Sequence, residues 1–401
     1  MKIAIIGDSY PPIKTSAASM IHDLACEFSK RGQTPIVITP DSCIEEPVNI
    51  SYEDNIKIIR VKNSDTKNIN YFKRAILEFL MPFSMIRKLK KSNILDEKLD
   101  GVIWYSPSIF YGPLVYALKR NSRCNSYLIL RDIFPEWAVD LGLMSRGPSY
   151  LFFKLVENFQ YLVADTIGYQ SPGNEGYFLK KRRPTNQRLE VLYNWISETK
   201  HESCSIILNK TSLAGRKIFV YTGNMGIAQN IRGILPIIEF IDKNHTNIGF
   251  IFVGSGEDAD YLSKEIKKKD IQNTLIYEEI PHNQLPSLFD QCDFGIVSLD
   301  ARHQTQNIPG KFIAYIKNGL PVLACINEGN DLHKIIEQNH IGKSYVGFKD
   351  ENLIDDIIKM ANDDTFRVSS STNCRKLADE KFSSSNAYKQ IFNSLGLKLK
   401  Q

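Results

Sequence analysis

The chain alternates short apolar runs with stretches whose apolar residues follow helical spacing. In its first half the runs lie at residues 2–6, 35–39, 56–61, 101–105, 126–131 and 165–170. After the first run, one helical face carries Met20, Ile21, Leu24, Ala25 and Phe28. Gly32 follows that pattern as a helix cap. Apolar strands that alternate with amphipathic helices indicate a doubly wound, mostly parallel sheet.

The same pattern restarts after a polar stretch near residues 197–214. The new apolar runs lie at residues 217–223, 248–254, 274–279, 294–299 and 321–326. The chain has 401 residues, which is enough for two or three domains. We therefore predict an α/β fold with two Rossmann-like domains, residues 1–195 and 196–371, and a final helical stretch at 372–401.

Residues 308–324, IPGKFIAYIKNGLPVLA, carry the strongest chemical signal. A Pro-Gly pair opens a helix, Lys311 lies in its first turn, Gly319 caps its end, and an apolar strand follows. A helix N-terminus presents N–H groups and a partial positive charge that bind phosphate, and a lysine adds a full charge. Gly310 lets a ligand approach the backbone closely. The simpler alternative is a helix start with an exposed lysine.

This segment resembles the P-S-K-x-x-E-Y-x-A-x-G-x-P-V donor-binding signature of retaining, GT-B-fold glycosyltransferases of family 4. The matching residues are Pro309, Lys311, Tyr315, Gly319, Pro321 and Val322. Gly310 replaces a serine, Lys317 an alanine, and Ala314 the glutamate that holds the donor ribose in most relatives. The resemblance implies two domains facing a cleft, with the C-terminal helix packing back on the N-terminal domain. Within the family the chain looks most like bacterial N-acetyl-L-fucosamine transferases of O-antigen and capsule assembly, through residues 130–137 and 305–324.

The resemblance also implies a donor site in the second half. Its parts are two Gly-rich turns, YTGNMGIAQN (221–230) and FVGSGED (252–258), the base-cradling segment 277–299 and the sugar loop 301–307. The residues implied are Gly223, Asn224, Met225, Gly226, Gln229, Gly254, Ser255, Gly256, Ile280, Pro281, Leu285, Thr305, Gln306, Asn307, Ile308, Pro309 and Gly310. The family's usual Arg/Lys pair after the first turn is not in its place, so Lys311 is the expected phosphate cation. Ordinary strand-to-helix turns and a polar surface loop are the alternatives.

Two first-half segments resemble family segments at the cleft. DSYPPIKTSAAS (8–19) is similar to a loop that closes over donor and acceptor. Its assigned residues are Ser9, Tyr10, Ser16 and Ala17. LRDIFPEW (130–137) follows a buried strand, where open α/β sheets bind ligands. With Lys311, the predicted catalytic residues are Arg131 for an anionic acceptor, Asp132 to orient the acceptor hydroxyl, and Glu136. An ion pair that fixes a loop is the alternative.

Charge and cysteine content indicate which partners and which cellular compartment suit the protein. Up to Trp195 there are 26 basic and 20 acidic residues, a net charge of +6, whereas the remainder carries 24 and 25, a net charge of −1. An anionic partner should therefore meet the first half. Seven scattered cysteines without a C-x-x-C pair indicate reduced thiols in a cytosolic protein. No nucleic-acid motif accompanies the basic clusters.

Residues 69–91 combine six basic residues with aromatic and aliphatic ones, and Pro82 divides them. The segment fits an amphipathic helix in a membrane interface or a core-facing helix pair with a solvated basic edge. FLKKRRP (178–184) adds a second basic cluster. No run approaches the ~20 apolar residues that span a bilayer, and the N-terminus does not look like a signal peptide. We expect a cytoplasmic protein peripherally associated with the inner face of the cytoplasmic membrane.

The sequence thus predicts a retaining glycosyltransferase in O-antigen or capsule biosynthesis. It would move a sugar from a UDP-sugar to a lipid-linked or saccharide acceptor. We expect the UDP-sugar to be a co-substrate and the enzyme to need no cofactor. No D-x-D motif lies on a suitable loop, so we expect catalysis without a metal. The G-x-G-x-x-G fingerprint is absent after the first strand, which argues against an oxidoreductase. The alternatives are a sugar-nucleotide 2-epimerase that uses Asp132, Glu136 and His303, and a non-enzymatic binding module.

Overall fold

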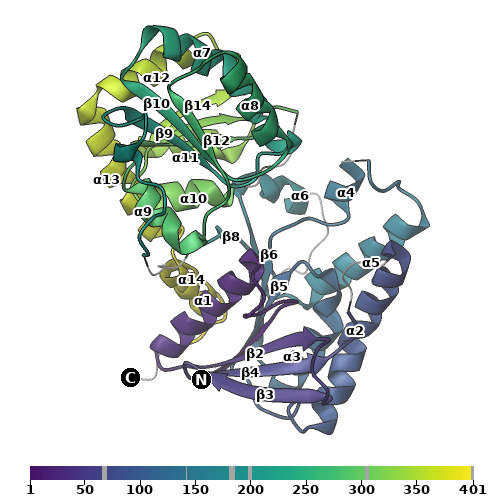
Figure 1. The fold of residues 1–401 in the computed structure, drawn as a ribbon. Helices are drawn as coiled ribbons and strands as arrows, with labels where there is room; N and C mark the ends of the chain where they lie inside the picture. The colour runs from purple at the N-terminus through teal and green to yellow at the C-terminus, as the bar shows by residue number, and fades with distance from the viewer. Residues whose placement is uncertain are drawn as a thin grey trace. The chain divides into compact units, whose positions relative to one another are not determined.

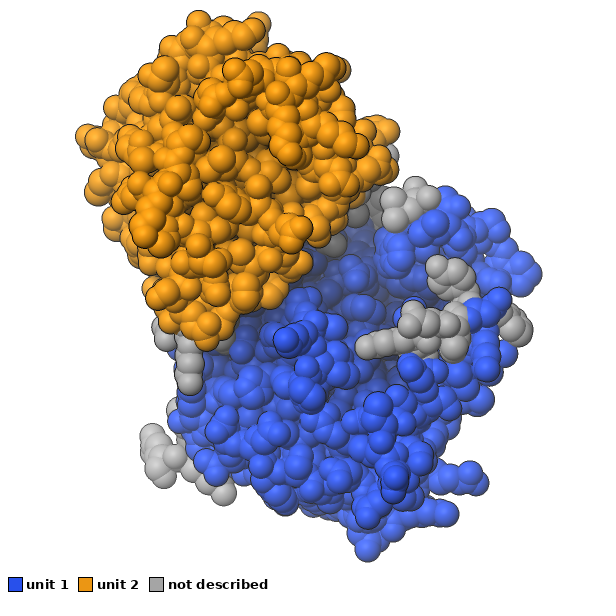
Figure 2. Space-filling view, in the orientation of Figure 1, with its two compact units in different colours: residues 1–197, 383–401 blue, residues 198–382 orange. Residues whose placement is uncertain are grey.

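The structure, a computed structural model, describes residues 1–65, 70–140, 142–179, 186–196, 201–302, 306 and 308–398. The chain forms two compact units, each built around one sheet (Figure 1). Unit 1 comprises residues 1–197 and 383–401, and unit 2 comprises residues 198–382 (Figure 2).

Over its described residues, unit 1 contains an eight-stranded sheet in the order β3-β4-β2-β1-β5-β6-β7-β8. Its strands are β1 (Lys2–Ile6), β2 (Thr34–Asp41), β3 (Val48–Glu53), β4 (Ile56–Lys62), β5 (Gly101–Ser106), β6 (Asn125–Leu130), β7 (Thr166–Tyr169) and β8 (Arg188–Val191). All neighbours are parallel except β3, which pairs antiparallel with β4 at one edge. The six predicted runs each form a strand. The two strands that were not predicted, β3 and β8, lie at the two edges and contain no fully buried residue.

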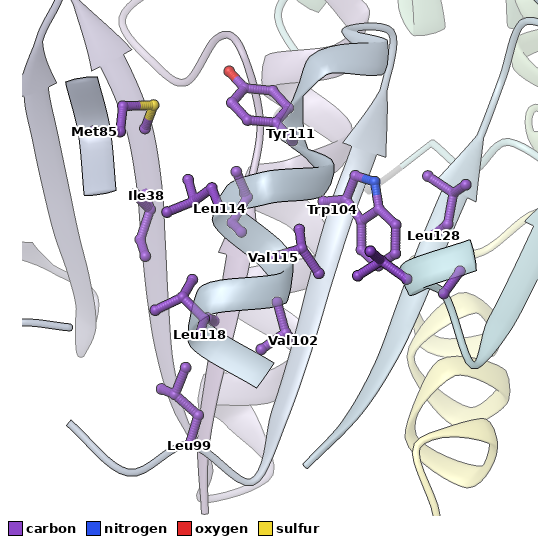
Figure 3. Close-up of a cluster of buried hydrophobic side chains, with 14 of the residues drawn as sticks. Ile38, Met85, Leu99, Val102, Trp104, Tyr111, Leu114, Val115, Leu118 and Leu128 are labelled. Atoms are coloured by element: carbon purple, nitrogen blue, oxygen red, sulfur yellow. The ribbon is translucent and has the colours of Figure 1, made fainter. Parts of the chain in front are cut away.

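Helices cover both faces of this sheet. They are α1 (Ser16–Lys30), α2 (Tyr71–Lys91), α3 (Gly112–Ser122), α4 (Glu136–Asp140), α5 (Pro148–Val163), α6 (Glu175–Leu179) and α14 (Ser384–Ser394). Leu114 and Leu118 of α3 pack with Trp104 of β5 in one core cluster (Figure 3). On the other face α14 packs on α1, where the Tyr388 and Phe28 rings lie 4.8 Å apart.

Helix α2 runs through Pro82 without a break, so the predicted division of residues 69–91 is wrong. A proline inside a helix removes one backbone hydrogen bond and costs about 3 kcal/mol. Met81, Met85 and Leu89 of this helix are buried in the core of unit 1, and their packing offsets that cost.

In the part of unit 2 that the structure describes, six parallel strands form a sheet in the order β11-β10-β9-β12-β13-β14. The strands are β9 (Lys217–Thr222), β10 (Ile248–Val253), β11 (Thr274–Tyr277), β12 (Phe294–Ser298), β13 (Val322–Ile326) and β14 (Gly342–Val346). The helices are α7 (Leu235–Asn244), α8 (Glu257–Lys268), α9 (Leu285–Phe289), α10 (Gly310–Lys317), α11 (Asp331–Asn339), α12 (Leu353–Asn362) and α13 (Asp364–Lys381). The five predicted strands are present, and β14 was not predicted because only Tyr345 within it is buried.

The final helical stretch is two helices rather than one. Helix α13 belongs to unit 2, and α14 belongs to unit 1. The break falls at Phe382 and Ser383, and the Ser383 side chain accepts a hydrogen bond from the Asn386 N–H as the N-cap of α14. The return to the first unit thus begins at Ser383, eleven residues after the predicted boundary.

Candidate donor-phosphate site

The two Gly-rich turns of unit 2 follow β9 and β10, which are neighbours in the sheet. The Gly223 N–H donates to the Val253 carbonyl at 2.9 Å, and the Met225 N–H donates to the Ser255 carbonyl at 2.8 Å. Gly254 has φ +152°, and a Cβ there would lie 2.0 Å from the Gly223 carbonyl oxygen. The turns therefore touch backbone to backbone, and only glycine fits.

Gly223 and Gly256 have the same kind of constraint. Their φ values are +101° and +138°, a region that side chains other than glycine rarely adopt. A Cβ at Gly256 would lie 2.5 Å from the Met225 carbonyl oxygen. The predicted phosphate turns thus form one glycine-lined edge at the carboxyl ends of two parallel strands, the position at which open α/β sheets bind ligands.

Lys311 lies in the first turn of α10 and directs its ammonium toward this edge. The Nζ atom lies 3.5 Å from the centre of the Tyr221 ring and 3.9 Å from where a Cβ on Gly223 would lie. It has no hydrogen-bond partner within the part of the chain that the structure describes. Burial lowers the pKa of Lys311 to about 7. A buried, unpartnered ammonium beside a glycine turn is suited to hold an anionic ligand.

Tyr315 connects the Lys311 helix to the first turn. Its hydroxyl accepts a hydrogen bond from the Thr222 N–H at 2.9 Å, at the last residue of β9. Its ring lies over Gly295, where a Cβ would come within 2.4 Å of a ring carbon. Helix α10 is therefore bonded to the strand end from which the Gly223 turn departs, which fixes Lys311 relative to that turn.

Arg232, the nearest arginine after the first turn, is occupied by other partners. Its guanidinium pairs with Glu257 at 2.7 Å and with the buried carboxylate of Asp258, and it lies over the Tyr261 ring. Arg232 thus holds the start of α8 in place. Gln229 caps the same turn, since its side-chain oxygen accepts from the Gly226 N–H at 3.2 Å and from the Asn224 amide at 2.9 Å.

The other predicted donor residues also lie in unit 2. Ile280, Pro281 and Leu285 lie between β11 and the start of α9. Ile308 is buried, and Pro309 is the N-cap residue of α10. The Gln306 side chain lies near Gly329, and its oxygen is buried without a partner in the described part of the chain. The predicted donor residues Thr305 and Asn307 lie outside the described residues, as does His303 of the epimerase alternative.

The predicted acceptor residues lie in unit 1, at the end of β6. Arg131 is buried, and its guanidinium donates to the Leu192 carbonyl at 2.5 Å and lies 5.4 Å from the Trp195 ring. Burial lowers the pKa of Arg131. Asp132 follows directly, and Glu136 begins α4, where it bonds to Lys154. In this structure Arg131 therefore anchors the segment after β8, and Glu136 is half of an ion pair.

The loop after β1 is also anchored within unit 1. The Tyr10 hydroxyl is buried and lies 2.9 Å from His22 Nδ1, and Ser9 Oγ lies 3.0 Å from the Thr15 hydroxyl. Ser16 and Ala17, which stand where the family's glycines fall, are instead the first two residues of α1.

Sequence reasoning missed the contribution of Tyr221, whose ring lies beneath the Lys311 ammonium. The available signal was its place near the end of a buried strand that leads directly into the Gly223 turn. An aromatic face attracts a cation, so Tyr221 holds the ammonium in place before a ligand arrives.

Comparisons with known proteins give the family and the fold that this chain resembles. Residues 207–377 match the family described as "Glycosyl transferases group 1". A curated relative, "Probable glycosyltransferase WbjE" of Pseudomonas aeruginosa, is 24% identical over 221 residues, 54% of this chain and 54% of the relative. The match thus spans about half the length of that relative. Together, the matched domain and the relative support a transferase enzyme.

Solved structures that match nearly the whole chain include the following two. Anabaena HepE, solved in complex with UDP-glucose, has a TM-score of 0.65 and 14% identity, covering 99% of each chain. WaaG, a glycosyltransferase involved in lipopolysaccharide biosynthesis, has a TM-score of 0.62 and 14% identity, covering 98% of this chain and 100% of WaaG. These likenesses confirm the predicted fold class, two parallel-sheet α/β domains of the GT-B type. Among the described residues, no helix is both long and apolar enough to cross a membrane.

Proposed function

We propose that this protein is a retaining glycosyltransferase that moves a sugar from a UDP-sugar to a hydroxyl of a lipid-linked or saccharide acceptor in bacterial surface polysaccharide (O-antigen or capsule) biosynthesis. The observation that carries this proposal is the buried Lys311 ammonium beside the glycine turns, which has no hydrogen-bond partner in the part of the chain that the structure describes. The match to a glycosyltransferase domain and the UDP-glucose complex of HepE support it. The proposed sugar is N-acetyl-L-fucosamine, supported by the resemblance of residues 130–137 and 305–324.

The proposed chemistry is a displacement on one face of the sugar. The bond between the anomeric carbon and the diphosphate oxygen breaks, and a bond to the acceptor oxygen forms on the same face. The acceptor proton passes to the departing phosphate, so no strong protein base is needed. Lys311, the N-terminus of α10 and the Gly223 turn stabilise the charge that gathers on the diphosphate. Because these groups supply the positive charge that the leaving diphosphate needs, we propose that sugar transfer proceeds without a metal ion. Asp132 remains the proposed partner of the acceptor hydroxyl.

Incubation of the full chain with a panel of UDP- and GDP-sugars tests the proposal. We expect free UDP only when a polyprenyl-diphosphate-linked saccharide is also present, and a product with the anomeric configuration of the donor by NMR. An epimerised sugar nucleotide formed without acceptor would instead support the 2-epimerase. Donor binding without turnover for any acceptor would indicate a binding module.

The Lys311 pKa gives a second test that needs no acceptor. At about pH 8 a group with a pKa of about 7 is mostly neutral, and binding of the diphosphate raises that pKa because the ammonium gains an anionic partner. We expect UDP-sugar binding to take up close to one proton at about pH 8 and almost none at about pH 6, with affinity falling as pH rises through 7 and above. Calorimetry in two buffers of different ionisation enthalpy measures the uptake. An equal uptake by Lys311→Met would contradict the assignment.

A further inference from the structure

Helix α5 exposes several large apolar side chains and buries two polar ones. Its exposed large residues share one helical face, which we call the outward face of α5: Leu151, Phe152, Leu155, Phe159 and Leu162. Leu151 is 62% exposed and Leu155 is 70% exposed, whereas Glu157 and Gln160 are fully buried. A surface helix of a globular protein normally buries its apolar side chains and exposes its polar ones.

A polar network within unit 1 fixes this orientation. The Lys154 ammonium lies 2.9 Å from the Glu157 carboxylate, donates to the Tyr177 hydroxyl at 2.6 Å and pairs with Glu136. The Tyr177 hydroxyl in turn bonds to Glu157. Turning the helix to bury its leucines would pull the buried carboxylate away from its partners, which is costly. The outward face of α5 is therefore built into unit 1, and exposed apolar surface of this kind marks an interaction site.

The apolar surface continues onto α2, which lies beside α5 (Figure 1). The Phe79 ring lies 5.7 Å from the Phe83 ring on its own helix and 5.4 Å from the Phe152 ring on α5. Among the side chains of α2 that the structure describes, the exposed large ones are Ile76, Leu80 and Phe83. The buried face of α2, with Met85, points into the core, whereas this apolar strip is exposed to a partner.

A basic groove of about 730 Å³ opens at the other end of α5. Tyr116, Phe159 and Leu162 form its apolar wall, and its cations are Lys119, Arg120 and Arg123. Lys119 is paired with Asp165 at 2.7 Å. Arg120 and Arg123 are exposed, and neither has an ion-pair partner among the residues that the structure describes. Phe159 and Leu162 thus belong both to the outward face of α5 and to a groove with two available guanidinium groups.

We propose that the outward face of α5 lies in the interface of an anionic phospholipid bilayer. Arg120 and Arg123 hold a headgroup phosphate in the basic groove, and Phe159 and Leu162 contact the acyl chain below it. Charge complementarity favours lipid over a protein partner, because the apolar face is continuous with cations and unit 1 carries the chain's positive excess. With 16 residues, α5 is about 24 Å long and suited to lie flat in the interface.

Vesicle flotation of the full chain tests this surface. We expect binding to phosphatidylcholine vesicles that contain about one third phosphatidylglycerol, weakened by salt, and much less binding to phosphatidylcholine alone. Combining Leu151→Ser with Leu155→Ser should lower binding about tenfold or more. Tyr52→Ser is the matched control, since Tyr52 is 70% exposed on β3 of the same unit, and it should bind like wild type.

A second pair of variants tests the groove. Arg120→Glu with Arg123→Glu should lower binding to the anionic vesicles about tenfold or more. Lys268→Glu with Lys359→Glu changes the net charge equally on exposed helices of unit 2 and should have a much smaller effect. Equal losses for both pairs would show attraction by overall charge and overturn the headgroup site.

Other outcomes would overturn the surface itself. The proposal would be contradicted if the wild-type protein did not bind the anionic vesicles at low salt. It would also be contradicted if the double leucine variant bound them like wild type. A wild-type dimer that the leucine variant converts to monomer in analytical ultracentrifugation would contradict it too, because the outward face of α5 would then join two copies. The inference rests on the proposed function only for its lipid-linked acceptor. Vesicle binding without sugar transfer would count against the proposed function alone, and transfer without vesicle binding against this surface alone.

Discussion

Replacing Lys311 with methionine is expected to lower the turnover number a hundredfold or more, with the fold intact. The ammonium is the charged group directed at the glycine turns, and loss of one such stabiliser of developing charge costs on the order of 3 kcal/mol in the barrier. Methionine keeps most of the volume of the lysine stem and removes only the charge. Turnover is measured with a UDP-sugar and acceptor, and the fold by thermal unfolding.

Stability separates a catalytic effect from a structural one. In the unliganded protein the Lys311 ammonium is buried and has no hydrogen-bond partner among the described residues, so its removal should leave the free energy of unfolding unchanged or higher. A folded Lys311→Met protein with wild-type turnover would show that the diphosphate does not rely on this lysine. A variant that loses turnover only because it unfolds would show that Lys311 supports the fold of unit 2.

The local parts of the site could be predicted from the sequence, and the parts that depend on packing could not. The Gly223 turn and the Lys311 helix each lie within one short segment, and so were predictable. Two other contacts depend on how β9 packs against α10. One is the Lys311 ammonium over the Tyr221 ring, and the other is the hydrogen bond that the Tyr315 hydroxyl accepts from the Thr222 N–H. The ion pairs that occupy Arg232 depend on residues about 25 positions away.

The same distinction applies to the fold. Fully buried strands such as β5 and β10 appear in the sequence as continuous apolar runs, whereas β3, β8 and β14 are partly exposed and carry no such run. The orientation of α5 was also beyond sequence reasoning. Its polar residues face inward because of partners on α4 and α6, and helical periodicity alone cannot say which face is buried.

Replacing Gly254 with alanine is expected to damage both stability and donor binding. A Cβ there would lie 2.0 Å from the Gly223 carbonyl oxygen, and φ +152° is unfavourable for alanine, so the two turns must move apart. We expect the free energy of unfolding to fall by about 3 kcal/mol or more and donor affinity about a hundredfold or more. Chemical denaturation and calorimetric titration with a UDP-sugar measure the two effects.

Gly176→Ala is the matched control for Gly254→Ala. Gly176 lies in α6, and among the described residues its added Cβ would meet no atom within 4 Å beyond its own helix; alanine also favours a helix by about 1 kcal/mol over glycine. This variant should be at least as stable as wild type and bind donor equally well. Wild-type stability and donor affinity in Gly254→Ala would show that the two turns are not in contact in solution. Suppose that Gly254→Ala behaved like wild type and Lys311→Met still lowered turnover. The lysine would then act without the neighbouring glycine turns, and the diphosphate would have to bind elsewhere along α10.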